Sequence, residues 1–176
     1  MPNLLFISVS DKEDIKKNQL VKELKNWGKE YKIEFGIKVM KLPKHPTNVL
    51  HISASDNNDK NYGDRIPAVF IHKEGYARIC SAVNDEKNFC KDLNFELGKK
   101  YQATIQQLEK DGKYWYEIIV DGKSEFKIEN KNPKSFENCK LYLSDPWHAT
   151  FSSDLGMIND LKITVVETDV SGKYYF

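Results

Sequence analysis

Two Asp-Gly pairs within residues 99–130 constrain the fold of this chain more than any other feature. Asp111-Gly112 and Asp121-Gly122 separate three strand-like segments. A type I′ turn needs positive φ at both central residues, so Asp-Gly between such segments is among the strongest hairpin signals. In the middle segment, four side chains share one face: Tyr114, Tyr116, Ile118 and Val120. The sequence therefore predicts a three-stranded antiparallel meander over residues 99–130.

The same two-residue period recurs outside the meander. From residue 30 to residue 40 the apolar side chains share one face, as in a half-buried strand: Tyr31, Ile33, Phe35, Ile37 and Val39. Further strands are expected over residues 4–9, 49–54, 66–72, 76–83, 139–144 and 157–166. Residues 18–27 fit a helical stripe as well as a strand, and their β context favours a strand or a loop.

About a dozen short strands at regular spacing, with no clear helix, are typical of a two-sheet sandwich. We therefore expect an all-β fold, a two-sheet antiparallel β-sandwich of the jelly-roll type. No internal repeat, low-complexity tract or linker divides the sequence. A length of 176 residues suits one domain, and a single domain over residues 1–176 is expected.

The charge balance bears on the partners of the chain. It has 27 basic and 26 acidic residues, and its formal net charge is +1. Nucleic acids and anionic membranes select basic faces, so we expect neither as the main partner. No segment approaches the ~20 apolar residues that a membrane span requires, and no membrane insertion is expected. The first residues lack the regions of a secretory signal, so Met1 is either a native start or the first residue of an excised domain.

The three cysteines leave at least one thiol without a partner inside the chain. Cys80 and Cys90 flank a turn-like stretch at residues 84–87, and that turn would place them one residue out of register. A disulfide between them and three buried free thiols are both compatible with the sequence. No Cys-x-x-Cys or Cys/His pair has the spacing of a zinc site.

Several motifs in the second half of the chain resemble those of laminin-G-like domains. Residues 97–101 (LGKKY) resemble the entry strand of these domains, and residues 118–122 (IIVDG) resemble their Val-Asp-Gly hairpin. Residues 156–163 (GMINDLKI) are similar to the closing strand. Three further stretches resemble extracellular lectin-like domains of the concanavalin A-like lectin/glucanase superfamily: residues 63–70, 79–84 and 143–147.

The resemblance covers about residues 20–166 and implies a concanavalin A-like fold. It also implies an extracellular or cell-surface location. The superfamily pattern has no cysteine at the position of Cys80, so the thiols are peculiar to this chain. Lectins, adhesion modules, pentraxins and glycosidases all use this fold, so the resemblance is specific for the fold and weak for the function.

The polar loop after residue 54 is a candidate calcium site. Calcium prefers hard oxygen ligands, and members of the resembled superfamily often hold it at a loop rim. The candidate ligands are Asp56, Asn58, Asp59, Asn61 and Asp64. The EF-hand pattern is absent, because Lys60 interrupts it and no glutamate closes the loop. Since Asn, Asp and Gly also form turns, an ordinary surface loop is the alternative.

Five residues are candidates for a ligand-binding rim: Asp64, Arg65, Asp145, Trp147 and His148. An exposed Trp147 would stack on a sugar ring, and Asp145 would accept hydrogen bonds from its hydroxyls. Each candidate also has a structural alternative. Trp147 would then close the edge of the sandwich, while Asp64 would accept hydrogen bonds in a turn and Arg65 would pair across the sheet.

Catalytic carboxylates are not evident in the sequence. The hydrolases of the superfamily resemble Glu-x-Asp-x-x-Glu on one strand, and this chain lacks that motif. Glu30 and Glu34 lie four residues apart, which is about 13 Å along a strand and beyond the ~5–9.5 Å of a catalytic pair. We therefore expect a non-enzymatic, extracellular, lectin-like module that binds a glycan or glycoprotein, with calcium as the one cofactor considered.

Two alternatives to a lectin-like module stay open at this stage. One is a structural or adhesive module of an extracellular assembly, in which the odd cysteine and the aromatic tail would contact other chains. An oligomer is compatible with this role. The other is a glycoside hydrolase of the same fold.

Overall fold

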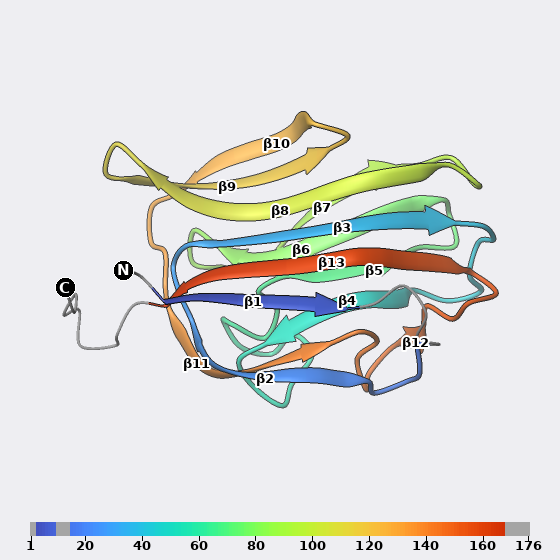
Figure 1. Cartoon of the computed structure of the whole chain (residues 1–176), viewed down its shortest axis with the longest axis horizontal. Coiled ribbons are helices and arrows are strands. Elements are labelled where there is room, and N and C mark those ends of the chain that lie inside the picture. Colours follow the sequence, from blue (N-terminus) through green and yellow to red (C-terminus); the bar gives the residue numbers. More distant parts are fainter. Residues whose placement is uncertain (1–2, 10–14, 168–176) are drawn as a thin grey trace.

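The computed structural model describes residues 3–9 and 15–167 of the chain, and these residues form thirteen strands and no helix (Figure 1). The strands are β1 (Asn3–Val9), β2 (Leu20–Trp27), β3 (Tyr31–Val39), β4 (Thr47–Ser53), β5 (Ala68–Ile71), β6 (Tyr76–Val83), β7 (Glu86–Asn94), β8 (Lys100–Lys110), β9 (Lys113–Val120), β10 (Lys123–Asn130), β11 (Phe136–Tyr142), β12 (Ala149–Thr150) and β13 (Gly156–Glu167). Within these ranges, no helix is long and apolar enough to cross a membrane.

The strands build two sheets that pack face to face, and this confirms the predicted antiparallel β-sandwich (Figure 1). Sheet A has the order β1-β13-β3-β8-β9-β10, and sheet B has the order β2-β11-β4-β5-β6-β7. Strand β12 joins sheet B by parallel pairing with β4, while the other pairs are antiparallel. Among the described strands, β7 and β10 are edge strands of the two sheets.

The predicted meander is present as β8, β9 and β10. Both Asp-Gly pairs have the positive φ that a type I′ turn needs: 55° and 75° at Asp111-Gly112, and 49° and 78° at Asp121-Gly122. Local turn chemistry therefore specifies the pairing next to each turn, with Lys110 opposite Lys113 and Val120 opposite Lys123, while a bulge between Ser124 and Phe126 shifts the register further along β10.

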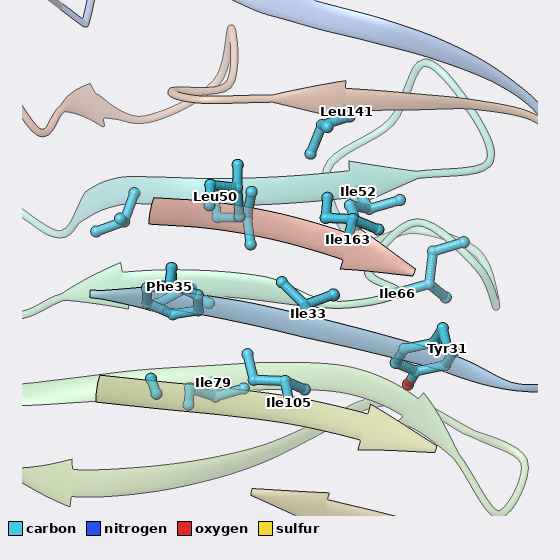
Figure 2. Close-up of a cluster of buried hydrophobic side chains, with 14 of the residues drawn as sticks. Tyr31, Ile33, Phe35, Leu50, Ile52, Ile66, Ile79, Ile105, Leu141 and Ile163 are labelled. Atoms are coloured by element: carbon cyan, nitrogen blue, oxygen red, sulfur yellow. The ribbon is translucent and has the colours of Figure 1, made fainter. Parts of the chain in front are cut away.

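The predicted apolar face of residues 31–39 points into the space between the sheets. Ile33 lies in register with Ile105 on one side and Ile163 on the other, and all three are fully buried. Figure 2 shows Ile33 and Phe35 on β3 with the labelled side chains of the facing sheet, among them Leu50 and Ile79. Burial of this continuous apolar layer is the main favourable term in folding.

The structure decides one ambiguity of the sequence and corrects one expectation. Residues 20–27 are a strand paired with β11, and both Leu24 and Trp27 are buried in the core. The turn after β6 has two residues, Asn84 and Asp85, and not four as the sequence suggested.

The short turn and a bulge, with its extra residue in β7, correct the predicted register of the two cysteines. The pairing of β6 with β7 shifts between Ser81 and Val83, and this shift brings Cys80 directly opposite Cys90. The two residues form a disulfide, and Cys139 is a buried free thiol.

Candidate functional site

The outer face of sheet B, the face directed away from sheet A, gathers the side chains with the most distinctive chemistry. Leu50, Ile52, Val69, Ile71 and Ile79 point into the core. Successive side chains of a strand alternate between the two faces, so the residues between them point outward: His51 on β4, Phe70 on β5 and Arg78 on β6. Two loops, residues 54–67 and residues 143–148, pack over this face.

His51 connects the two loops. Its Nδ1 lies 2.8 Å from Oδ2 of Asp145, and its Nε2 lies 2.7 Å from the carbonyl oxygen of Asp64. Both ring nitrogens therefore face acceptors, and the imidazolium is the form that donates to both. His51 has no exposed surface, so this contact is part of the interior of the site.

Asp145 organises the loop that follows β11. Its Oδ1 accepts the backbone N–H groups of Trp147 (3.0 Å) and His148 (2.8 Å). Its Oδ2 accepts from the rings of His51 and His148, each at 2.8 Å. Burial would raise the pKa of Asp145, but the hydrogen bonds from His148 and His51 outweigh it and hold this pKa well below the usual value.

The acceptor capacity of the Asp145 carboxylate is therefore fully used. A carboxylate offers about four lone-pair directions, and four donors already occupy them. This geometry does not fit the predicted contact between Asp145 and the hydroxyls of a ligand. Asp145 instead positions Trp147 and His148.

Asp64 and Arg65 make structural contacts. Asp64 accepts hydrogen bonds in a turn, and Arg65 pairs with a residue on strand β7 of sheet B. The carboxylate of Asp64 accepts from the hydroxyl of Ser55 and, at 2.7 Å, from the backbone N–H of Asn61, which closes the turn of the loop. The guanidinium of Arg65 donates to Asn88 of β7 and to Asn58, both at 2.8 Å. It also lies 4.9 Å from the centre of the Phe70 ring.

Trp147 and His148 are the two candidates that reach the surface. The ring of Trp147 is half-buried, with its centre 5.2 Å from that of His51 and 6.1 Å from that of Tyr142. The ring of His148 packs against Phe70, with 4.7 Å between ring centres, and its side chain is 20% exposed. The structure thus brings the five predicted ligand residues together and leaves these two accessible.

The candidate calcium loop does not bring its three carboxylates together. Asp56 pairs with Lys140, Asp59 lies 3.6 Å from Arg65, and Asp64 is buried in the turn. Across the described part of the chain, no three His, Cys, Asp or Glu side chains are grouped to hold a metal. The three carboxylates do not converge, because each meets a separate donor, and these contacts favour the ordinary surface loop that was the alternative.

A row of accessible side chains beside this cluster was missed by the sequence analysis. We name it the exposed row: His72, Tyr76, Arg78 and Asp92. The rings of His72 and Tyr76 stack with 4.6 Å between centres and 14° between planes. Arg78 donates from Nε and Nη2 to the two carboxylate oxygens of Asp92, at 2.7 and 2.8 Å. Its guanidinium carbon lies 5.4 Å from the centre of the Tyr76 ring.

Two members of the exposed row, Arg78 and Asp92, are charged and open to solvent. The side chains of Arg78 and Asp92 are 37% and 44% exposed. Their mutual hydrogen bonds raise the pKa of Arg78 and lower that of Asp92, so both are ionised at neutral pH. Burial, followed by the charge of Arg78, lowers the pKa of His72, which keeps this ring neutral.

The sequence did contain a signal for the exposed row. The predicted hairpin over residues 66–72 and 76–83 places Phe70 opposite Arg78, as the structure confirms. Alternation then puts His72 and Tyr76 on the same face. Chemically, this face offers a flat ring stack beside a group that donates and a group that accepts hydrogen bonds.

Comparison with known proteins supports the fold. No protein-family model matches the chain, and no curated protein matches it in sequence. A SAP-like pentraxin from Limulus polyphemus is similar in structure, with a TM-score of 0.55 and 15% identity over 92% of this chain and 76% of its own. The ligand-binding domain of botulinum neurotoxin serotype D has a TM-score of 0.54 and 10% identity, over 97% and 38%.

Trypanosoma rangeli sialidase is also similar, with a TM-score of 0.52 and 15% identity over 81% of this chain and 21% of the sialidase. The chain thus spans about a fifth of the sialidase. At these identities the likeness concerns the fold, a β-sandwich of the jelly-roll type.

Proposed function

We propose that this chain is a non-enzymatic, lectin-like module that binds carbohydrate on the outer face of sheet B. The exposed row would form the binding surface, with His148 and Trp147 at its border. The observation that carries the proposal is the bidentate pair of Arg78 and Asp92 beside the stacked rings of His72 and Tyr76.

A sugar ring presents hydroxyl groups at its edge and C–H groups on its faces. The hydroxyls both donate and accept, so a binding site needs donors and acceptors side by side. Arg78 uses two of its five N–H groups on Asp92 and keeps the others for a ligand. The Tyr76 ring offers an apolar surface for the C–H face and loses little conformational entropy, because it is already stacked on His72.

The neighbouring structures lend support. The neurotoxin serotype D domain was solved in complex with N-acetylneuraminic acid, and the sialidase in complex with 2,3-difluorosialic acid. Both ligands are acidic sugars, so acidic as well as neutral glycans belong in a test of this chain. The disulfide between Cys80 and Cys90 supports an extracellular or cell-surface location, because disulfides persist in oxidising environments.

The alternative of an adhesive module without a small ligand has less support. It assigned the odd cysteine to contacts between chains, but Cys139 is fully buried. Burial also raises the pKa of the Cys139 thiol to about 12, so the reactive thiolate is scarce at neutral pH. The aromatic tail at residues 174–176 lies outside the described residues.

A glycan array with labelled protein, in calcium and in EDTA, tests the proposal. We expect a sugar-specific signal that Tyr76→Ala and Arg78→Ala each weaken at least about tenfold, the effect of losing about 1.4 kcal/mol. Tyr114→Ala on β9 of sheet A is the matched control and should bind as the wild type.

Silence across the array would favour the adhesive module, and a ring or filament in light scattering would support that role. If both Tyr76→Ala and Arg78→Ala bind the glycan as the wild type does, the binding site lies elsewhere than at the exposed row. Turnover of a polysaccharide panel would revive the glycoside hydrolase.

A further inference from the structure

An apolar cavity of about 60 Å³ lies between the two sheets, away from the outer face of sheet B. Its inner end is formed by Phe35 and Ile79, which belong to the core (Figure 2). Its outer end is formed by Leu93, Phe95 and Tyr101, which are half-buried. The cavity thus extends from the core to the side of the sandwich where β7 faces β8 and β9.

The opening arises because the sheet edges meet along only part of their length. Phe89 of β7 packs on Phe126 of β10, with 5.4 Å between ring centres, and closes the edge there. Four residues further along β7, Leu93 faces smaller side chains, Ala103 and Val120, across the cavity. This size difference leaves the space between the sheets unfilled.

The mouth of the cavity combines apolar and positively charged groups. The turn between β7 and β8 is held against it, because the N–H of Gly98 donates to the carbonyl of Val39, a lining residue, at 2.8 Å. Leu97 in this turn is 52% exposed. Nζ of Lys99 lies 5.1 Å from the centre of the Tyr101 ring, so a positive charge sits at the entrance.

We propose that this cavity binds the hydrocarbon chain of a free, unbranched carboxylate, with Lys99 meeting the carboxylate at the mouth. Apolar cavities stay dry and take up apolar ligands. At roughly 10–15 Å³ for each water-sized group, the volume suits about four to six methylene-sized groups.

The charge of Lys99 selects an anionic head group over a neutral or cationic one. Its partner in the structure is Glu96, with Nζ and Oε1 3.3 Å apart. Both side chains are mostly exposed, and an exposed ion pair of this kind contributes little to stability. A ligand carboxylate anchored by its buried chain can therefore replace Glu96.

Titration calorimetry with butanoate, hexanoate, octanoate and decanoate tests the proposal. We expect Kd to fall about fourfold for each added methylene, the effect of burying one such group, until the chain fills the cavity. Beyond that length Kd should level off. A Kd that is the same for butanoate and octanoate would overturn the proposal.

Cavity-filling variants locate the binding. Ala77→Leu should abolish the dependence on chain length, and Ala77→Val should shorten the length at which Kd levels off. Ala149→Leu, the same change at an exposed position of β12, should bind as the wild type. Melting curves establish that each variant is folded, and unchanged octanoate binding by a folded Ala77→Leu or Ala77→Val protein would overturn the proposal.

Two further experiments test the contact between Lys99 and the carboxylate, and whether the ligand is a free carboxylate or a membrane surface. Lys99→Gln should weaken octanoate binding about three- to tenfold and leave octanol binding unchanged. Binding to anionic vesicles without binding to free octanoate would show a membrane surface as the ligand and overturn the proposal. Tyr76→Ala should leave octanoate binding unchanged, which separates this cavity from the carbohydrate site.

Discussion

The ring nitrogen Nδ1 of His51 lies 2.8 Å from the carboxylate oxygen Oδ2 of Asp145, although the two residues are 94 positions apart in the sequence. Neither side chain has any exposed surface. The contact joins the middle of sheet B to the loop that carries Trp147 and His148. The accessible part of the candidate site is therefore supported by a buried pair that does not itself touch solvent.

We expect Asp145→Asn to lower the free energy of unfolding by about 3–5 kcal/mol, because removing one partner leaves a buried group without its counter-charge. An amide can still accept the backbone N–H groups, but its NH₂ group faces the histidine donors. Urea denaturation measures the change, and the exposed carboxylate of Asp92 supplies the control, since Asp92→Asn should cost less than about 1 kcal/mol. A loss of that small size at Asp145 would contradict the role assigned to it.

The same carboxylate should make stability depend on pH in the acid range. The folded state lowers the pKa of Asp145, so its contribution is fully present above the unfolded value of about 3.9 and is lost as pH falls through the lower folded value. The stability difference between the wild type and Asp145→Asn should therefore shrink below about pH 4. Urea unfolding of both proteins at a series of pH values measures it, and a constant difference would contradict the lowered pKa.

Replacing Phe35 or Ile118 by alanine should cost on the order of 3–4 kcal/mol. Both side chains are buried between the sheets, and the loss combines the transfer free energy of the removed groups with the cavity left behind. Denaturant unfolding of each variant measures this. Losses below ~1 kcal/mol at both positions would mean that these side chains do not form the core.

Calcium should leave the melting temperature unchanged within about 1 °C, because Lys140 and Arg65 already supply positive charge to Asp56 and Asp59. A site occupied at a hundredfold excess over Kd would instead add about 2.7 kcal/mol. For a domain of this size that is a rise of roughly 5–10 °C. Melting with millimolar calcium and with EDTA decides between the two, and a rise that Asp59→Asn abolishes would establish the calcium site.

The fold could be predicted where its causes are local. Asp111-Gly112 and Asp121-Gly122 define their turns by their own φ preferences, and the alternation of residues 31–39 identifies a core face without reference to the rest of the chain. The ambiguity at residues 20–27 arose because the spacing of Leu24 and Trp27 suits a helical period, while the flanking segments favour a strand. Only pairing with β11, a tertiary contact, decides between them.

The disulfide shows a limit of another kind. Its register depends on a bulge between Ser81 and Val83, which has no signature in the residue types around it. The sequence predicted the position of this turn correctly but gave it four residues, and the structure has two. A change of one residue in the register decides whether Cys80 faces Cys90.

For the candidate site, the sequence indicates which residues lie together better than it indicates the contacts that each one makes. Asp145, Trp147 and His148 were expected at a ligand surface, and they do lie on one face. The sequence could not show that four donors saturate Asp145, because one of them, His51, comes from a strand far away in the chain. It could not show either that Arg65 and Lys140 each lie near a different carboxylate of the loop.

The edge strands β7 and β10 carry charges of both signs. The charged residues of β10 are Lys123, Glu125, Lys127 and Glu129, and those of β7 are Glu86, Lys87, Lys91 and Asp92. A strand of another molecule that paired with either edge would have to strip water from these groups without providing matched partners. Continuation of either sheet through β7 or β10 is therefore unfavourable, so the side of the sandwich that carries the cavity mouth also resists strand pairing with another molecule.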